Sequence, residues 1–218
     1  MQPRLSRQRE TGMTLFEVGV MAAIVLFLAA LFLPRILRPR RPYAGVNCVN
    51  NLKQVGLACR IWEGDNGDIY PTGISVTNGG SMEMAQTGNV VQTFLVMSNE
   101  LSTPRILYCP DDVSRFDAGT FAGLSNSNLS YFVAVDVTND VNPNLIISGD
   151  CNFEIAAKPV KSGLFSLWTN DPVAWTATRH KGYGNLGLAD GSVESASASG
   201  LRNYLRQTGL ATNRLAIP

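Results

Sequence analysis

The stretch TGMTLFEVGVMAAIVLFLAALFLPRILRPRRP, residues 11–42, decides how the chain is organised. From residue 13 to residue 33 its only charge is Glu17. A helix over this apolar run would extend about 31 Å at about 1.5 Å per residue, which matches the roughly 30 Å hydrocarbon core of a bilayer. The run ends at Pro34 and a group of arginines. We therefore expect a membrane-spanning helix over residues 13–33, not a cleaved secretory signal, whose apolar core is about 7–15 residues long.

Charge is distributed unevenly around this run. The whole chain carries a net +1, of which residues 1–12 carry +2 and residues 13–42 carry +3, so that residues 43–218 carry −4. A mildly acidic main domain has no electrostatic reason to bind nucleic acid. Arginines beside an apolar run suit anionic lipid headgroups. The charge pattern therefore predicts the lipid bilayer as a partner and excludes nucleic acid.

The segment TGMTLFEV resembles the N-terminal signal of type IV prepilins and type II secretion pseudopilins in the spacing of Gly12, Met13 and Glu17. In that family a prepilin peptidase removes a short basic leader after the glycine, and the new first residue is N-methylated. The resemblance implies a leader at residues 1–12 and processing between Gly12 and Met13. Family members usually have phenylalanine where Met13 stands, and many have proline where Pro34 stands.

An ionisable side chain within an apolar span costs about 2.5–3.5 kcal/mol on insertion scales, so it usually has a partner or a function. Cleavage would create a positively charged amine at Met13, about one helical turn from Glu17. In the family, such an amine and the glutamate of a neighbouring subunit set the stagger of a helical filament. We therefore expect Glu17 to direct assembly. The alternative is that Glu17 reaches the membrane interface and has no role.

The resemblance also implies a location and partners. The leader would lie in the cytoplasm, a single span would cross the inner membrane, and the head would be periplasmic. The partners would be the prepilin peptidase, an inner-membrane assembly platform and other pilin or pseudopilin subunits. The implied function is that of a structural filament subunit, not an enzyme. Whether the filament is a secretion pseudopilus, a type IV pilus or a DNA-uptake fibre stays open, with the pseudopilus favoured by the resemblance.

Beyond the apolar run, three prolines predict a break at residues 34–42, because each removes a helix hydrogen bond. A second helix should follow and end by residues 64–67, because apolar residues recur there at the spacing of one helix face. These residues are Cys48, Leu52, Val55, Cys59 and Trp62. A stripe of this kind needs a sheet to cover it.

The remaining chain predicts an α+β head at residues 43–218. We expect a short helix at residues 90–101, strands at residues 105–110, 129–137, 144–150 and 163–168, a hairpin turning at Asp190-Gly191, and a short helix ending at Gly209. Taken with the resemblance, the expected fold is pilin-like. It would consist of an N-terminal hydrophobic transmembrane helix and a second amphipathic helix packed on a small antiparallel sheet.

Later segments resemble a branch of pseudopilin-like proteins common in planctomycetes and verrucomicrobia: CVNNLKQVGLA, ILYCPDD, LSYFVAVD and RHKGYGNLGLADGSV. The branch shares a His-x9-Asp-Gly pattern, here His180, Asp190 and Gly191, which implies no established chemistry. His180 is the only histidine, and the nucleophile pattern GxSxG is absent. We expect a structural histidine that bonds a buried loop, with a catalytic or ligand role as the alternative.

The four cysteines would lie in an oxidising compartment if the head is exported. Cys48 and Cys59 are about 16 Å apart along one helix, too far to bond to each other. Cys48 and Cys109 both lie in segments shared with the branch, so the resemblance implies a Cys48–Cys109 disulfide. The alternative is four buried free thiols. A zinc site made of the four cysteines is not favoured, because no C-x2-C pair exists.

No cofactor is expected, although two further kinds of site were weighed. Asp136 and Asp140 could line a calcium loop, but turns stabilised by their side chains are favoured. Trp62, Trp168 and Trp175 could bind a glycan, but core packing is favoured. The rival functions are a membrane-tethered periplasmic enzyme and a glycan-binding or calcium-binding module. Either rival needs only an anchor and would not need the Gly12, Met13 and Glu17 spacing.

Overall fold

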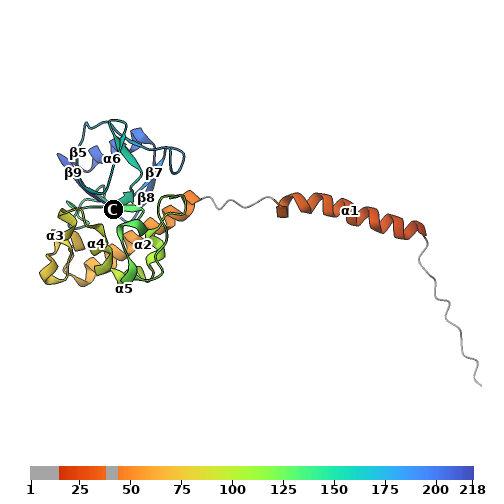
Figure 1. The fold of residues 1–218 in the computed structure, drawn as a ribbon, viewed down its shortest axis with the longest axis horizontal. Coiled ribbons are helices and arrows are strands. Elements are labelled where there is room, and N and C mark those ends of the chain that lie inside the picture. The colour runs from red at the N-terminus through yellow and green to blue at the C-terminus, as the bar shows by residue number, and fades with distance from the viewer. Residues whose placement is uncertain (1–14, 38–43) are drawn as a thin grey trace, which may run out of the picture. The chain divides into compact units, whose positions relative to one another are not determined.

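The computed structural model describes residues 15–37 and 44–218, with the side chains of residues 31–37 outside the description. The chain divides into two compact units, Met1–Arg41 and Pro42–Pro218, and Figure 1 shows the helix of the first and the α+β fold of the second. The expected leader at residues 1–12, the processing position at Gly12 and Met13, and residues 38–42 of the expected break lie outside the described residues.

The described part of the first unit is the helix α1, Leu15–Leu37. Its sequence is dominated by alanine, leucine and other good helix formers. Glu17 lies in its first turn, where a negative charge interacts favourably with the helix dipole. The helix continues past Pro34 to Leu37.

The predicted transmembrane helix at residues 13–33 is wrong. Among the residues that the structure describes, no helix is long and apolar enough to cross a membrane. The pilin-like fold expected from the sequence is corrected accordingly, and what the structure does contain is an α+β unit.

The second unit begins with the helix α2, Ala44–Asp65. All five residues of the predicted apolar stripe are buried: Cys48, Leu52, Val55, Cys59 and Trp62. This face contacts β2, β7 and β8 of the main sheet. The helix ends where Gly67 takes up a positive φ of 71°, a conformation that glycine adopts without strain.

The main sheet has six strands in the order β5-β9-β1-β2-β7-β8. Its strands are β1 (Tyr131–Ala134), β2 (Ile146–Asp150), β5 (Gly163–Trp168), β7 (Gly184–Leu188), β8 (Val193–Ala196) and β9 (Thr212–Ile217). Every neighbouring pair is antiparallel. The predicted hairpin is present, with β7 and β8 joined through Asp190-Gly191.

A second antiparallel sheet has three strands in the order β4-β3-β6. They are β3 (Phe153–Ile155), β4 (Lys158–Pro159) and β6 (Val173–Trp175). An aromatic chain joins the two sheets, because Phe153 packs edge-on against Phe132 at 6.0 Å and against Trp175 at 6.3 Å between ring centroids. The two sheets therefore share one core.

Short helices complete the second unit. The α-helices are α3 (Met82–Gln86), α4 (Val90–Val96), α5 (Ser98–Leu101) and α6 (Ala198–Gln207). The 3-10 helices are η1 (Pro71–Gly73), η2 (Val76–Asn78), η3 (Pro104–Leu107), η4 (Phe121–Gly123) and η5 (Asn126–Asn128). In Figure 1, α2 to α5 gather on one side of the unit and the labelled strands on the other.

Two strand predictions need correction. Residues 105–110 do not form a strand, because Pro104 and a Thr103 side chain that accepts from the Arg105 N–H start the 3-10 helix η3 instead. Residues 129–137 contribute only the short β1, and all four of its residues are buried. Alternation between a buried and an exposed face is therefore not observed, because other elements cover both faces of this central strand.

Candidate functional site

His180 lies in the loop between β6 and β7, in an unusual backbone conformation. Both His180 and the following Lys181 have positive φ, at 47° and 56°. Such a conformation costs about 1–2 kcal/mol for each residue other than glycine, so its surroundings must stabilise it. The side chain of His180 is only 7% exposed. The loop therefore directs the imidazole ring into the protein.

The ring of His180 lies between two carboxylates and a sulfur atom. Its Nδ1 is 2.9 Å from Oδ2 of Asp111, and its Nε2 is 3.4 Å from Oδ2 of Asp150. The same Nε2 is 3.5 Å from Sγ of Cys109. Burial by itself lowers the pKa of His180, but the contact and charge of Asp150 and the charge of Asp111 outweigh burial and raise that pKa above its ordinary value.

Asp150, the last residue of β2, is fully buried. Its Oδ2 accepts hydrogen bonds from the backbone N–H of Asn185 at 2.8 Å and from Nδ2 of Asn185 at 2.7 Å. Its Oδ1 accepts no hydrogen bond from any described residue. An unsatisfied buried oxygen lowers the stability of the fold by about 1–3 kcal/mol, so Asp150 destabilises the head at this position.

A buried ion pair lies beside this group. Nη2 of Arg179 is 2.7 Å from Oδ2 of Asp112, and both side chains are almost fully buried. The hydroxyl of Ser130 donates to the same Asp112 oxygen at 2.8 Å, and Nη1 of Arg179 donates to the Ser130 carbonyl at 3.1 Å. Nη2 of Arg179 also lies 3.4 Å from Sγ of Cys151. The pair fixes the segment that carries Asp111 against the one that carries His180.

Cys48 and Cys109 form a disulfide, the pairing implied by the resemblance, with their Cα atoms 5.4 Å apart. It joins α2 to the segment after η3. Cys59 and Cys151 are buried free thiols. The alternative of four free thiols is therefore wrong for Cys48 and Cys109 and correct for the other two cysteines. Burial, followed by the charge of Glu63, raises the pKa of Cys59 to about 12. The disulfide packs against Leu52 and Tyr131 in a small apolar cluster.

The structure brings together residues that the sequence separates widely. Cys48, Cys109 and His180 each offer an atom suited to a metal, and these atoms lie within 4.8 Å of one another. Within residues 15–37 and 44–218 this is the only such group of three or more. In the sequence the histidine and the cysteines are separate features, and this group was not predicted. The signal available was that ILYCPDD and RHKG both belong to the segments of the resemblance.

Asp190 and Gly191 have a local structural role. Oδ1 of Asp190 accepts from the Ser192 N–H at 2.8 Å, and Gly191 supplies a positive φ of 85°. The Ser192 side chain, followed by this N–H, lowers the pKa of Asp190. The Asp190 carbonyl accepts from Nη1 of Arg60 at 3.0 Å. His180 precedes β7 and Asp190 follows it, so the two ends of the His-x9-Asp-Gly pattern lie at opposite ends of one strand.

The two calcium candidates each have an arginine partner. Oδ1 of Asp136 accepts a hydrogen bond from Nε of Arg214 at 2.7 Å, and Oδ2 accepts one from the Arg214 backbone N–H at 2.8 Å. Asp140 is 3.4 Å from Nη2 of Arg60. The structure therefore does not gather these carboxylates around a common point.

The three tryptophans do not share a surface. Trp62 and Trp175 are buried in the core. Trp168 is 60% exposed, at the end of β5. A platform of stacked aromatic side chains for a glycan is thus not formed by these residues.

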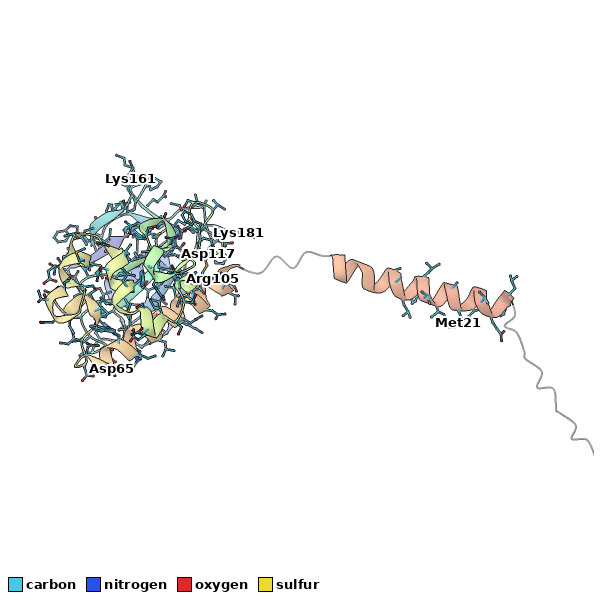
Figure 2. All side chains as sticks on the ribbon, turned by 60° about the horizontal axis from the view of Figure 1, so that its bottom comes forward. Met21, Asp65, Arg105, Asp117, Lys161 and Lys181 are labelled. Atoms are coloured by element: carbon cyan, nitrogen blue, oxygen red, sulfur yellow. A yellow bond between two sulfur atoms is a disulfide. The ribbon has the colours of Figure 1, made fainter. Side chains whose placement is uncertain are left out.

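The second candidate site is the surface of α1. From Leu15 to Ala30 every residue is exposed except Ala29, which is half-buried. The exposed side chains include Leu15 at 92%, Phe16 at 80% and Leu26 at 70%, and they occur on all sides of the helix. Figure 2 shows the described side chains of α1, with Met21 labelled, projecting around it.

Comparisons with family models, curated proteins and solved structures find no match for this chain.

Proposed function

We propose that this chain is a structural subunit of a pilus-like filament of the pseudopilin type, in which α1 packs against the α1 helices of further copies. The observation that carries the proposal is the apolar surface on all sides of α1 between Leu15 and Ala30. The proposal assigns the head no catalytic role.

The distribution of apolar residues on α1 favours a bundle of several helices. A helix with a single apolar stripe is satisfied by one partner, whereas a helix that is apolar all round needs partners on every side. Burying one leucine, valine or phenylalanine side chain stabilises an assembly by about 1.5–3 kcal/mol. Leu15, Phe16, Val25, Leu26 and Phe27 all offer such surface. Copies of the same helix supply matching apolar surface.

The spacing of Gly12, Met13 and Glu17 supports the pilin type of assembly. Removal of residues 1–12 by a prepilin peptidase would leave a methylated, positively charged amine at Met13. Glu17 lies in the first turn of α1, near that amine in the chain. An amine of one subunit and a glutamate of its neighbour attract each other strongly in apolar surroundings, because the dielectric constant there is low. This attraction would set the stagger between neighbouring α1 helices.

The first test is the N-terminal mass of the protein purified from the cells that make it. A chain that begins at N-methylated Met13 supports the proposal. A chain that retains residues 1–12 overturns the pilin type of assembly, because the amine beside Glu17 is then absent.

The second test traps α1 helices against one another. A Leu26→Cys variant should give covalent dimers in high yield with a short bis-maleimide, since bundled helices bring the Leu26 positions of neighbouring copies close together. The matched control is Val113→Cys, whose position on the head is 93% exposed. Dimers with Leu26→Cys and none with Val113→Cys support the bundle. Monomers alone, or equal dimer yields from both variants, contradict it.

A further inference from the structure

The surroundings of Nε2 of His180 have the dimensions of a metal site. Around a tetrahedral Zn²⁺, ligand atoms lie about 2.0–2.3 Å from the metal and therefore about 3.3–3.8 Å from one another. Nε2 of His180 is 3.5 Å from Sγ of Cys109 and 3.4 Å from Oδ2 of Asp150. The distance to Sγ is the separation expected between a nitrogen and a sulfur that share one tetrahedral ion. Asp150 is a further polar neighbour of the ring.

We propose that reduction of the Cys48–Cys109 disulfide opens a buried site for a borderline-soft divalent metal such as Zn²⁺, bound by both sulfurs and Nε2 of His180, with the fourth position taken by a small ligand such as water. The sulfur and nitrogen atoms of these three residues already lie within 4.8 Å of one another. Two sulfurs on one tetrahedral Zn²⁺ stand roughly 3.8 Å apart. Binding therefore requires that the S–S bond break and the two sulfurs separate by rotation of their side chains.

Asp111 orients the histidine for this task. Metal-binding histidines usually donate their second N–H to a carboxylate or carbonyl, which fixes the ring and its tautomer. Oδ2 of Asp111 is 2.9 Å from Nδ1 of His180. A bound metal would take the place of the proton on Nε2, while Nδ1 keeps its proton and donates a hydrogen bond to Asp111. Asp111 is thus a positioning residue and not a ligand.

Burial makes a cation favourable here. Asp150 is fully buried and its Oδ1 accepts no hydrogen bond from a described residue. Both sulfurs are equally buried, next to Leu52 and Tyr131. Charges in apolar surroundings are costly unless they are paired or bound to a metal. A divalent ion would neutralise the two thiolates, and the carboxylate of Asp150 adds a negative charge beside the site.

A dithiol reductant donates two electrons and two protons to the disulfide, which becomes two thiols while the reductant becomes a disulfide. Binding of Zn²⁺ then releases the two thiol protons to solvent, and two Zn–S bonds form. Reoxidation by a disulfide of the surrounding medium reverses the sequence and expels the ion. The metal and the disulfide are therefore mutually exclusive.

The test uses Co²⁺ as a spectroscopic probe of the full chain. The protein is titrated with Co²⁺ alone, once oxidised and once after reduction by a phosphine that is then removed without air. Reduced protein should bind one Co²⁺ and show the thiolate-to-cobalt charge-transfer band and the intense visible bands of a tetrahedral complex. Zn²⁺ should abolish both, and the oxidised protein should show neither.

Variants separate the site from accidental binding. His180→Gln keeps the disulfide, so the variant can be purified folded. Asp111→Asn should lower the affinity of the reduced chain for Co²⁺ about 10–100-fold. His180→Gln should lower that affinity at least as much. The matched control is Cys59→Ala, which removes a buried thiol of α2 that is not part of the site. It should bind Co²⁺ like the unmodified chain.

Three results would overturn the inference. One is the absence of the thiolate–Co²⁺ bands of a tetrahedral complex after reduction. This result counts whether or not circular dichroism shows the reduced chain to be folded. Another is equal binding by oxidised and reduced protein. The third is unchanged affinity in His180→Gln. None of these results bears on the bundling of α1, which is tested separately by N-terminal mass and cross-linking.

Discussion

Among single residues, Glu63 on α2 links the stability of the head to pH. Its side chain is buried, and burial, followed by the charge of Asp140, raises its pKa, while Tyr70 and Arg60 act in the opposite direction. A raised folded-state pKa means that this carboxyl contributes most to stability when protonated. That contribution is complete below the ordinary pKa of 4.5 and is lost as the pH rises through the raised value.

Replacing Glu63 by glutamine should therefore stabilise the head at neutral pH and have little effect in acid. Glutamine keeps the shape but cannot ionise, so it avoids the cost of a buried charge near Asp140. Thermal unfolding of both proteins between about pH 4 and pH 8 gives the comparison, with the difference in Tm growing as the pH rises. A constant difference across that range would show that ionisation of Glu63 is not the cause.

The ion pair of Asp112 and Arg179 should matter far more than a surface pair. Asp112→Ala leaves the Arg179 guanidinium buried without its charged partner, which typically costs about 3–5 kcal/mol. The matched control is Asp117→Ala, whose partner Arg105 lies 3.5 Å away on the surface (Figure 2). An exposed pair contributes about 0–1 kcal/mol. Urea unfolding of both variants measures the contrast, and similar losses would contradict the assignment.

At the scale of elements, predictions succeeded where the sequence carries a strong local pattern. The stripe that begins at Cys48 has the period of a helix over several turns, and α2 buries all of it. Asp190-Gly191 has the chemistry of a tight turn, and it joins β7 to β8. The strand predicted at residues 105–110 was wrong, because Thr103 and Pro104 start a 3-10 helix in this apolar segment. Local chemistry outweighed apolar content there.

The strand β9 shows what local patterns cannot supply. Its sequence, TNRLAI, is short and polar in its first half, and it was not predicted. It lies inside the main sheet, between β5 and β1, and pairs with both. Its extended conformation is thus fixed by neighbours that lie far away in the chain, and a reading of residues 212–217 alone cannot reveal them.

Because β9 lies inside the sheet, truncating one of its core side chains should be costly. Leu215 is 2% exposed and faces partners on both neighbouring strands. Leu215→Ala should destabilise the head by about 2–5 kcal/mol, the usual range for removing a buried leucine side chain. Val113→Ala, at an exposed position, should change stability by less than about 0.5 kcal/mol. Equal effects in urea unfolding would argue against the position of β9.

For the molecule as a whole, the candidate metal site depends on topology. Cys109 and His180 are 71 residues apart, and Cys48 and Cys109 are 61 apart. They meet because α2 packs on the sheet and because the pairing of β1, β2 and β7 places Asp150 beside Asn185. The sequence identified His180 and Cys109 as members of shared segments. Their contact could not be inferred, because no local pattern encodes a register between distant strands.

The division into two units permits a test in which assembly fails and the head stays intact. Leu26 is 70% exposed on α1 and belongs to the unit Met1–Arg41, whereas the hydrophobic core of the head belongs to the unit Pro42–Pro218. Leu26→Lys should leave the free energy of unfolding of the head within about 0.5 kcal/mol of the unmodified protein, as for other exposed positions. In a bundle of α1 helices the same lysine would be a buried charge without a partner, which costs several kcal/mol per subunit.

Leu26→Lys should therefore abolish filaments while the head unfolds at an unchanged temperature. Sedimentation and electron microscopy measure assembly, and circular dichroism measures unfolding. The matched control, Val113→Lys, adds the same charge to an exposed position of the head and should assemble normally. If Leu26→Lys assembles as well as Val113→Lys, the apolar surface of α1 is not the assembly surface, and the filament proposal fails. If Leu26→Lys lowers the unfolding temperature of the head, α1 contacts the head, and the two units are not independent.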